Sequence, residues 1–405
     1  MIGIGTVIDL GRGILGSAAK VVGSFPSFDR KYHINRRLDG PWPEGPCLWL
    51  HGASLGECKV LLNLAELLRR DLPNCPRILL TTQKVEVVPV LEKMGEGLVD
   101  VSIAPADTPA SMSKFIRKVQ PQTLILAENE LWPGYLSSMS RTSLKPSVAL
   151  VSGRFRKAFP GIDFSSIGFA CMQTEADRQR ISESALSSKF WPMVGGDWKI
   201  ISFLHNNPTE HLGARESETA TGEGSKDVDL ALLSVHFPEW EALSEIIRVC
   251  KLRNKSVVLM PRRLEEVELF RQELQTNNVK VVEWPQVRQG GVTLIDQFGL
   301  TGQILERARQ SLVGGSFCPK PGIHDFWEPL LAKVPTCVGP YAGGHEDLVE
   351  ELVQEGAIAR LSSASDFENL DLVDEKQMQG CLDLEKEKVS DSYQQLLRFL
   401  EDLLK

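Results

Sequence analysis

The sequence lacks several short motifs by which common enzyme classes are recognised. It has no C-x-x-C pair and no H-E-x-x-H, the spacings typical of zinc ligands. It also has no G-x-G-x-x-G after a predicted strand and no G-x-x-x-x-G-K-[ST], which disfavours an NAD-dependent enzyme and a P-loop NTPase. The composition, 42% apolar and 24% charged, excludes a disordered or fibrous chain. A length of 405 residues suggests two or three domains.

The charges and cysteines indicate which partners and which cellular compartment to expect. The net charge of −8 argues against a general nucleic-acid-binding protein, so we expect no nucleic acid partner. Residues 1–200 carry 24 basic and 19 acidic side chains, a net of +5, and the remaining residues carry a net of −13. The eight cysteines are scattered through apolar stretches, which predicts buried free thiols in a reducing compartment.

Residues 1–45 are predicted to form a membrane-proximal segment that does not cross the bilayer. Its apolar runs fall short of the ~18 residues that a spanning helix needs, and it lacks the layout of a signal peptide. Apolar residues at helical spacing precede a basic cluster: Ile4, Ile8, Leu15, Ala18, Val22 and Phe25, then Arg30, Lys31, Arg36 and Arg37. This arrangement predicts peripheral contact with an anionic membrane surface; a helix packed on its own domain is the alternative.

From residue 46 onward, short β-rich runs alternate with helical stretches, a pattern that predicts parallel sheets covered by helices. We expect strands at fourteen places: 47–54, 77–82, 98–104, 122–128, 146–152, 169–174, 190–195, 228–235, 255–261, 279–285, 291–296, 310–316, 335–339 and 357–363. Residues 204–227 are polar and predict a linker. The sequence therefore predicts two doubly wound domains facing a cleft, 46–203 and 228–385, and a C-terminal helix over 386–405.

The stretch HGASLGE, which ends at Glu57, follows the first predicted strand and enters a helix. Glu57 would therefore stand near a helix N-terminus at the edge of a parallel sheet where ligands bind. A carboxylate there can act as a general base that takes a proton from an attacking hydroxyl. The alternative is a capping glutamate favoured by the helix dipole.

Another acidic stretch, ENELWP, follows the strand expected at 122–128. Glu128 and Glu130 flank a turn, and Pro133 is suited to the first turn of a helix. The two carboxylates are candidates for binding acceptor hydroxyls or an amine. An ordinary helix cap explains the same spacing.

The second half contains two further candidate sites. Gly314, Gly315 and Ser316 stand at a strand exit, where backbone N–H groups can approach a phosphate, although such pairs of glycines also form simple turns. Glu328 lies one turn into a predicted helix. A carboxylate there can accept from both ribose hydroxyls, and exposure to solvent is the alternative.

In chain order, these stretches resemble the motifs of the 3-deoxy-D-manno-octulosonic acid (Kdo) transferases of lipopolysaccharide synthesis. The family block W-x-H-x-x-S-x-G-E is matched by Trp49, His51, Ser54, Gly56 and Glu57. Further blocks follow in unbroken order. Two are intact, Q-T-E-x-D at 173–177 and V-G-G-S at 313–316. The others keep part of the family pattern: E-x-E-L-W-P at 128–133, S-G-R at 152–154, G-D-W-K at 196–199, P-R-R at 261–263, D-Q-F-G at 296–299 and G-x-H-x-x-x-E at 322–328.

The resemblance implies a GT-B glycosyltransferase with two Rossmann-like domains. It would transfer Kdo from CMP-Kdo to a lipid A precursor, lipid IVA, at the cytoplasmic face of the bacterial inner membrane, with inversion and with no metal or other cofactor. Glu57 would be the catalytic base. The acceptor would be bound by Ser54, Gly56, Glu128, Glu130 and Arg154. The donor would be bound by Lys199, Ser234, His236, Arg262, Gly314, Gly315, Ser316, His324 and Glu328.

Three stretches depart from the family pattern, at 84–88, 236–239 and 341–345. These departures affect the expected identity of the sugar and of the lipid. They affect the expected type of reaction less. Two alternatives therefore stay open. One is a GT-B transferase that uses another nucleotide sugar, and the other is a non-catalytic descendant that binds a nucleotide or a lipid.

Overall fold

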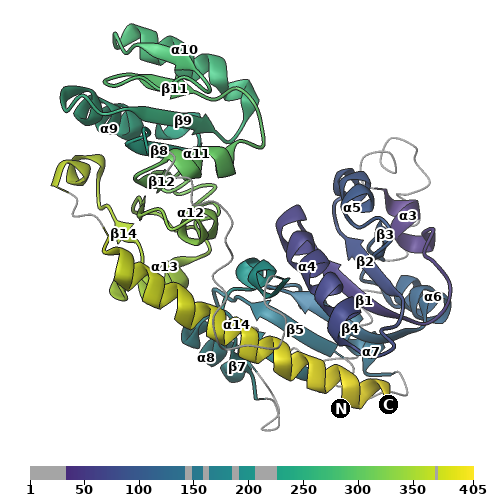
Figure 1. The fold of residues 1–405 in the computed structure, drawn as a ribbon. Coiled ribbons are helices and arrows are strands. Elements are labelled where there is room, and N and C mark those ends of the chain that lie inside the picture. Colours follow the sequence, from purple (N-terminus) through teal and green to yellow (C-terminus); the bar gives the residue numbers. More distant parts are fainter. Residues whose placement is uncertain (1–32, 142–147, 158–163, 185–190, 206–225, 370–372) are drawn as a thin grey trace. The chain divides into compact units, whose positions relative to one another are not determined.

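The computed structural model describes the chain except residues 1–32, 142–147, 158–163, 185–190, 206–225 and 370–372. The chain divides into two compact units (Figure 1). Unit 1 comprises Met1–His211 and Glu385–Lys405, and unit 2 comprises Leu212–Leu384. Most of the predicted membrane-proximal segment and of the predicted linker lies outside the described residues.

Unit 1 is built on a parallel sheet of seven strands in the order β3-β2-β1-β4-β5-β6-β7. The strands are β1 (Cys47–Gly52), β2 (Ile78–Thr82), β3 (Asp100–Ile103), β4 (Pro121–Ala127), β5 (Val148–Gly153), β6 (Ile167–Met172) and β7 (Met193–Val194). The helices between them are α4 (Leu55–Asp71), α5 (Val88–Met94), α6 (Pro109–Val119), α7 (Pro133–Met139) and α8 (Glu175–Ser184), and α3 (Ile34–Asp39) precedes the sheet. A 3₁₀ helix, η2 (Trp198–His205), follows β7.

The residues of β1 explain why helices cover both faces of this sheet. Every residue of β1 is buried, as expected for a central parallel strand. Trp49 packs between Phe115 of α6 and Tyr135 of α7, with ring centroids 4.4 and 4.9 Å apart. The long helix α4 buries an apolar stripe that includes Leu61, Leu64 and Leu68. The packing of the unit 1 core therefore fixes β1, the strand that precedes Glu57.

Unit 2 repeats the plan with strands in the order β10-β11-β9-β8-β12-β13-β14. They are β8 (Leu230–Val235), β9 (Val257–Pro261), β10 (Val281–Glu283), β11 (Val292–Leu294), β12 (Ser311–Val313), β13 (Thr336–Val338) and β14 (Ala359–Arg360). The helices are α9 (Trp240–Leu252), α10 (Val267–Thr276), α11 (Thr301–Arg307), α12 (Trp327–Leu331) and α13 (Glu346–Gln354), with 3₁₀ turns η3 (Phe237–Glu239), η4 (Leu264–Glu266) and η5 (Ala364–Asn369).

The residues of β8 alternate between two apolar cores. Leu230 and Leu232 belong to one cluster of buried side chains, and Ala231 and Leu233 belong to another. Successive side chains of a strand point to opposite faces of the sheet, so each face needs its own cover. A strand that is apolar on both faces is the pattern expected at the centre of such a sheet.

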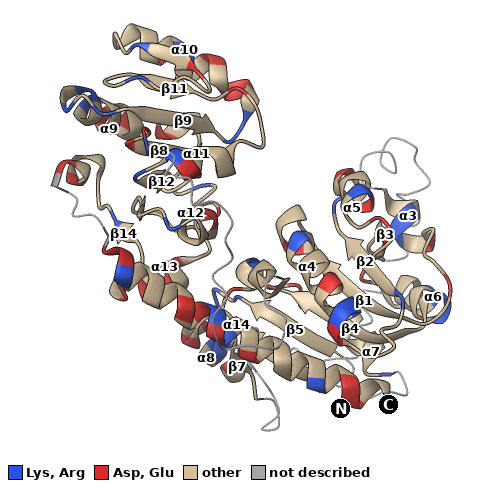
Figure 2. Cartoon of the chain, viewed as in Figure 1, with Lys and Arg blue, Asp and Glu red and all other residues tan. Residues whose placement is uncertain are grey.

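The last helix, α14 (Glu375–Leu404), matches the charged stretch over 376–405 that the sequence predicts to be helical, and it includes the C-terminal segment 386–405. Its C-terminal part packs in unit 1, where basic and acidic residues alternate along it (Figure 2). Glu385 accepts a hydrogen bond from the backbone N–H of Asp197 at 2.9 Å, and Ser392 Oγ accepts from Trp198 Nε1 at 3.0 Å. Tyr393 donates to Asp71 at 2.8 Å. These buried polar contacts attach the chain end to the first sheet.

The sequence-based expectation of parallel sheets covered by helices is confirmed. Each of the fourteen predicted strands overlaps one of the fourteen strands described above, with ends that differ by at most three residues. Within the described part of the chain, no helix has the length and apolarity needed to cross a membrane.

We predict that Gly196→Ala destabilises unit 1. Gly196 has a φ of 70°, and a Cβ there would lie 2.6 Å from Glu385 Oε1. We expect a loss of about 1–3 kcal/mol in the free energy of unfolding, measured by urea denaturation. The control is Gly56→Ala in α4, where the nearest atom would be 3.8 Å away and a helical alanine is favourable. Equal stability of the two variants would contradict this account.

Candidate active site

In both units the candidate residues cluster where the order of the strands reverses. In unit 1 this switch point lies between β1 and β4, the strands that precede Glu57 and Glu128. In unit 2 it lies between β8 and β12, which precede His236 and Gly314. Ligands of doubly wound sheets bind outside the carboxyl ends of the strands at this point. The topology therefore joins stretches that are far apart in the sequence.

Glu57 is held at the start of α4 by a capping box. Its Oε2 accepts hydrogen bonds from the backbone N–H groups of Ala53 at 2.5 Å and Ser54 at 3.1 Å, and Ser54 Oγ accepts from the Glu57 N–H at 3.3 Å. Gly52 permits this close fit, because a Cβ at Gly52 would lie 2.9 Å from the Glu57 Cβ. Both bonds use Oε2, and no described residue hydrogen-bonds Oε1.

The surroundings of Glu57 change its acidity. Burial, together with repulsion from Glu128 and Glu130, raises the pKa of Glu57 to about 7, against the partial opposition of the two backbone N–H groups. A carboxylate with a pKa near neutrality is poised to take up and release a proton. The structure shows the cap, and the role of Glu57 as a base stays a prediction for the same side chain.

Glu57, Glu128 and Glu130 form what we call the carboxylate cluster. Glu128 and Glu130 each have a different partner. Glu128 is buried, with a φ of 54°, and is paired with Arg154 at 2.6 Å. Glu130 Oε2 accepts from Trp132 Nε1 at 2.6 Å. The structure thus brings the candidate base Glu57 together with four of the five expected acceptor residues: Ser54, Glu128, Glu130 and Arg154. Gly56 lies exposed on the first turn of α4.

His51 is a residue of this site to which the sequence analysis assigned no role. Its ring is fully buried, and Nδ1 lies 2.9 Å from Thr81 Oγ1, which also accepts from Trp49 Nε1 at 2.8 Å. Its Nε2 faces Glu130 Oε2 at 3.4 Å. His51 thus links the core of the sheet to one member of the carboxylate cluster. The position of His51 in the W-x-H part of the first motif is the feature of the sequence that could have indicated a role in the site.

In unit 2, the loops after β8 and β12 are joined by a pair of histidines. The Nε2 atoms of His236 and His324 lie 2.6 Å apart, so one must donate and the other accept, and the two rings cannot both be doubly protonated at this distance. Burial lowers the pKa of His236, against the opposing effect of Glu266 and Glu239. The histidine pair therefore presents one shared proton.

Glu239, which the sequence analysis did not select, holds the same two loops together. Its side chain is 2% exposed. Oε2 accepts from the backbone N–H groups of His236 and Gly315, each at 2.8 Å, and Oε1 accepts from Phe317 N–H at 2.9 Å. The amide of Gly315, expected to contact a phosphate, is thus paired with a carboxylate. In the sequence, Glu239 is indistinguishable from an ordinary cap of a helical turn.

The remaining donor candidates lie around these loops, with one exception. Ser234 has a φ of 54° at the end of β8, and Gly314 packs so closely that a Cβ would lie 2.4 Å from Val235 Cα. Ser316 Oγ donates to Val313 O at 2.6 Å. Two further candidates, Arg262 after β9 and Glu328 on α12, are exposed. The exception is Lys199, which lies in η2 of unit 1.

Comparisons with known proteins agree with this arrangement. A family model described as "3-Deoxy-D-manno-octulosonic-acid transferase (kdotransferase)" matches residues 28–199. A 3-deoxy-D-manno-octulosonic acid transferase of Chlamydia trachomatis is 27% identical over 329 residues, which cover 78% of this chain and 74% of the relative. One of Aquifex aeolicus is 25% identical over 312 residues, covering 76% and 80%. Residues 28–199 therefore match the family model, and most of the chain is similar to the 3-deoxy-D-manno-octulosonic acid transferases.

Solved structures identify the fold of the chain. MurG of Acinetobacter baumannii matches with a TM-score of 0.52 at 9% identity, covering 88% of this chain and 99% of MurG. A UDP-GlcNAc 2-epimerase of Neisseria meningitidis matches with a TM-score of 0.52 at 12% identity and the same coverage. The chain has the GT-B fold with two Rossmann-like domains, as expected.

We predict that Glu239→Gln loosens the loop after β12. The amide has one accepting oxygen, and its NH₂ group would face a backbone N–H, so at least one buried donor loses its partner. We expect a loss of about 1–3 kcal/mol in the stability of unit 2 and faster hydrogen exchange at the amides of Gly315 and Phe317, measured by mass spectrometry. Glu241→Gln, on the exposed start of α9, is the control. Unchanged exchange in Glu239→Gln would refute this role.

Proposed function

We propose that this chain transfers Kdo from CMP-Kdo to a lipid A precursor such as lipid IVA, with inversion at the anomeric carbon. Similarity to the family supports the type of reaction and the sugar. The observation that carries the proposal is the state of Glu57, whose pKa is raised to about 7 and whose Oε1 is bonded by no described residue.

The proposed reaction is a single displacement. Glu57 Oε1 takes the proton of an acceptor hydroxyl as the hydroxyl oxygen attacks the anomeric carbon of Kdo. The bond from that carbon to the CMP phosphate breaks, and CMP leaves with the bonding electrons. One base is sufficient, because no covalent sugar–enzyme intermediate is formed. The repulsion from Glu128 and Glu130 makes the protonated product state of Glu57 accessible near neutral pH.

Unit 2 supplies the groups proposed for the donor. Arg262 offers a cation for the phosphate, and Glu328 offers a carboxylate for the ribose hydroxyls. His236 and His324, bonded to each other through their Nε2 atoms, lie in the loops proposed for the donor. Lys199 is a second candidate cation for the phosphate, contributed by unit 1. The developing charge on CMP would be stabilised by these side chains.

Unit 1 carries the groups proposed for the lipid. Basic residues lie on α3 and α6, two helices that contact each other (Figure 2): Arg36, Arg37, Lys114, Arg117 and Lys118. These cations support contact of unit 1 with an anionic membrane surface and with the acceptor phosphates. Arg154, already paired with Glu128, has further N–H donors to offer. We place the protein peripherally on the cytoplasmic face of the bacterial inner membrane.

We further propose that transfer needs no metal ion or other cofactor, as the family resemblance implies. The charges that would stabilise the departing CMP are then those of the protein itself. Treatment with EDTA is expected to leave the rate of transfer unchanged, and loss of activity restored by a divalent cation would contradict this part of the proposal.

We predict that Glu57→Gln abolishes most of the transfer activity. The amide cannot accept the hydroxyl proton, so we expect the rate to fall by roughly 10²–10⁴-fold. The assay is mass spectrometry of the lipid products after incubation with CMP-Kdo and a tetra-acylated lipid A precursor. A wild-type rate in the folded variant would contradict the assignment of the base.

The folding control for this variant follows from the direction of the pKa shift. Folding raises the pKa of Glu57 above its ordinary value, so this carboxyl favours the folded state at low pH and loses that contribution as pH rises through about 7. At about pH 8, Glu57→Gln should therefore unfold at a temperature no lower than the wild type. A lower unfolding temperature would show that any lost activity reflects damage to the fold.

We predict that CMP stabilises the chain against heat more than UMP or GDP does, because a ligand stabilises the fold that binds it. Arg262→Gln should weaken CMP binding by about tenfold, whereas the neighbouring exposed Arg263→Gln should not. Greater stabilisation by UMP or GDP would favour a transferase that uses another nucleotide sugar. Binding of CMP without any lipid product would favour a non-catalytic descendant.

A further inference from the structure

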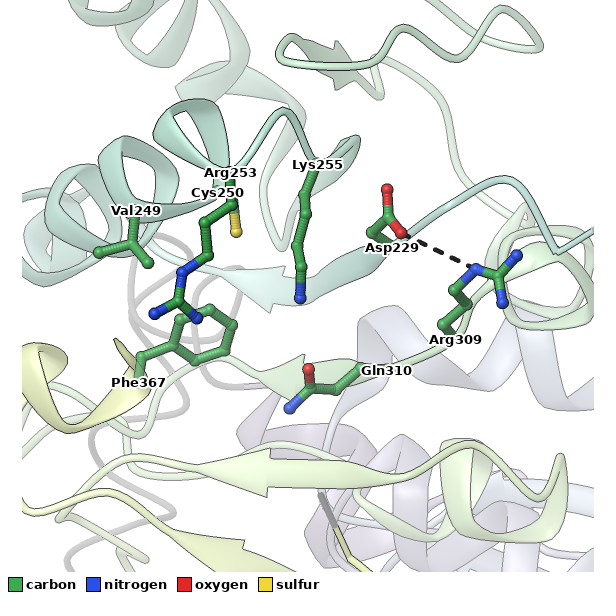
Figure 3. Close-up of a pocket in the computed structure, with 8 residues that line it drawn as sticks. All are labelled: Asp229, Val249, Cys250, Arg253, Lys255, Arg309, Gln310 and Phe367. Atoms are coloured by element: carbon green, nitrogen blue, oxygen red, sulfur yellow. Dashed lines mark ion pairs between the residues drawn. The ribbon is translucent and has the colours of Figure 1, made fainter. Parts of the chain in front are cut away.

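A second candidate site lies at the opposite edge of the unit 2 sheet from the donor candidates. It is a cavity of about 260 Å³ (Figure 3). Eight residues line it: Asp229, Val249, Cys250, Arg253, Lys255, Arg309, Gln310 and Phe367. None of them belongs to the proposed donor site.

The position of the cavity follows from the direction of the strands. Asp229 immediately precedes β8, Lys255 precedes β9 and Gln310 precedes β12. The donor candidates His236, Arg262 and Gly314 follow the same three strands. Because a strand rises about 3.3 Å per residue, the six residues of β8 separate the two edges by roughly 20 Å. A ligand in this cavity would therefore not occupy the donor site.

The charge of the lining favours an anion. Three cations, Arg253, Lys255 and Arg309, and one carboxylate, Asp229, line the cavity. Arg253 also pairs with Glu368, which lies outside the lining, at 3.6 Å and donates to its backbone carbonyl at 2.9 Å. The Oδ2 of that carboxylate already accepts from the backbone N–H of Ser256 at 2.8 Å and from its hydroxyl at 2.9 Å. Its Oδ1 lies 3.8 Å from Arg309 Nε. Asp229 is thus engaged at the side of the cavity, and Lys255 makes no ion pair within the described part of the chain.

Gln310 contributes an amide side chain to the lining of the cavity. It is only 9% exposed, and its amide points into the cavity toward the ammonium group of Lys255 (Figure 3). It makes no side-chain hydrogen bond to any described residue. The amide is therefore available to bond a ligand or solvent that enters the cavity.

The helix end beside the cavity does not oppose an anion strongly. The carbonyls in the last turn of α9 would repel one, but they are already bonded. Val249 O accepts from the Arg253 N–H at 3.1 Å, and Cys250 O accepts from the Lys255 N–H at 2.8 Å. The side chains of Val249 and Phe367 form an apolar wall next to the Arg253 guanidinium (Figure 3).

We propose that this cavity binds a small molecule that carries a phosphate group and an apolar or planar group. The phosphate lies between the Lys255 ammonium, the Arg253 guanidinium and the amide NH₂ of Gln310. The apolar group lies against Val249 and Phe367. This site goes beyond the transfer reaction and is independent of the proposed donor and acceptor.

The test is titration calorimetry of the full-length chain with phenyl phosphate and with inorganic phosphate, in chloride buffer. We expect the wild type to bind phenyl phosphate more tightly than inorganic phosphate. Lys255→Met should weaken phenyl phosphate binding at least tenfold without lowering the melting temperature, because Lys255 is exposed. The matched control is Lys251→Met, whose ammonium donates to Asn278 O outside the cavity and whose loss should leave the affinity unchanged.

Four results would overturn the proposal. The first two are no binding to the wild type and wild-type affinity in Lys255→Met. The third is an equal loss of affinity in Lys251→Met, which would indicate unspecific charge attraction. The fourth is a comparable loss in Arg262→Gln, which would place the ligand in the donor site. Equal affinity for the two phosphates would exclude the apolar wall from the site.

Discussion

The parallel direction of all neighbouring strands is the constraint on which both candidate sites depend. A loop that follows any strand must emerge at the same edge of its sheet, and the reversal of strand order opens a crevice there. Seventy residues separate Glu57 from the stretch that contains Glu128, yet β1 and β4 are neighbours and bring the two together. The same constraint joins His236 to His324 across β8 and β12.

The two units use buried carboxylates in opposite ways. In unit 1, Glu57 is partly buried and lies near two other carboxylates, so its affinity for protons rises. In unit 2, Glu239 accepts three backbone N–H bonds and fixes the shape of two loops. One arrangement creates a group able to exchange a proton, and the other creates a rigid frame. The difference arises from the neighbours of each carboxylate rather than from its position at a helical turn.

Much of the fold and part of the candidate site were predictable from the sequence. Buried parallel strands are continuous apolar runs such as those of β1 and β8, and the blocks around Glu57 and Glu128 carried the resemblance to the family. The roles of His51 and Glu239 were not predictable, because they depend on which strands are adjacent. The packing of α14 on unit 1 was missed for a related reason. A charged, amphipathic helix does not reveal its partner, and Glu385 acts only through the backbone of Asp197.

The central claim is that Glu57 is a base whose pKa is set by burial and by two neighbouring carboxylates. The most direct test is the pH dependence of kcat/KM for Kdo transfer by the wild-type chain. The account predicts that kcat/KM falls about tenfold per pH unit on the acidic side of a midpoint near 7, as Glu57 becomes protonated. An acidic midpoint near 4.5, the ordinary value for a glutamate, would contradict it.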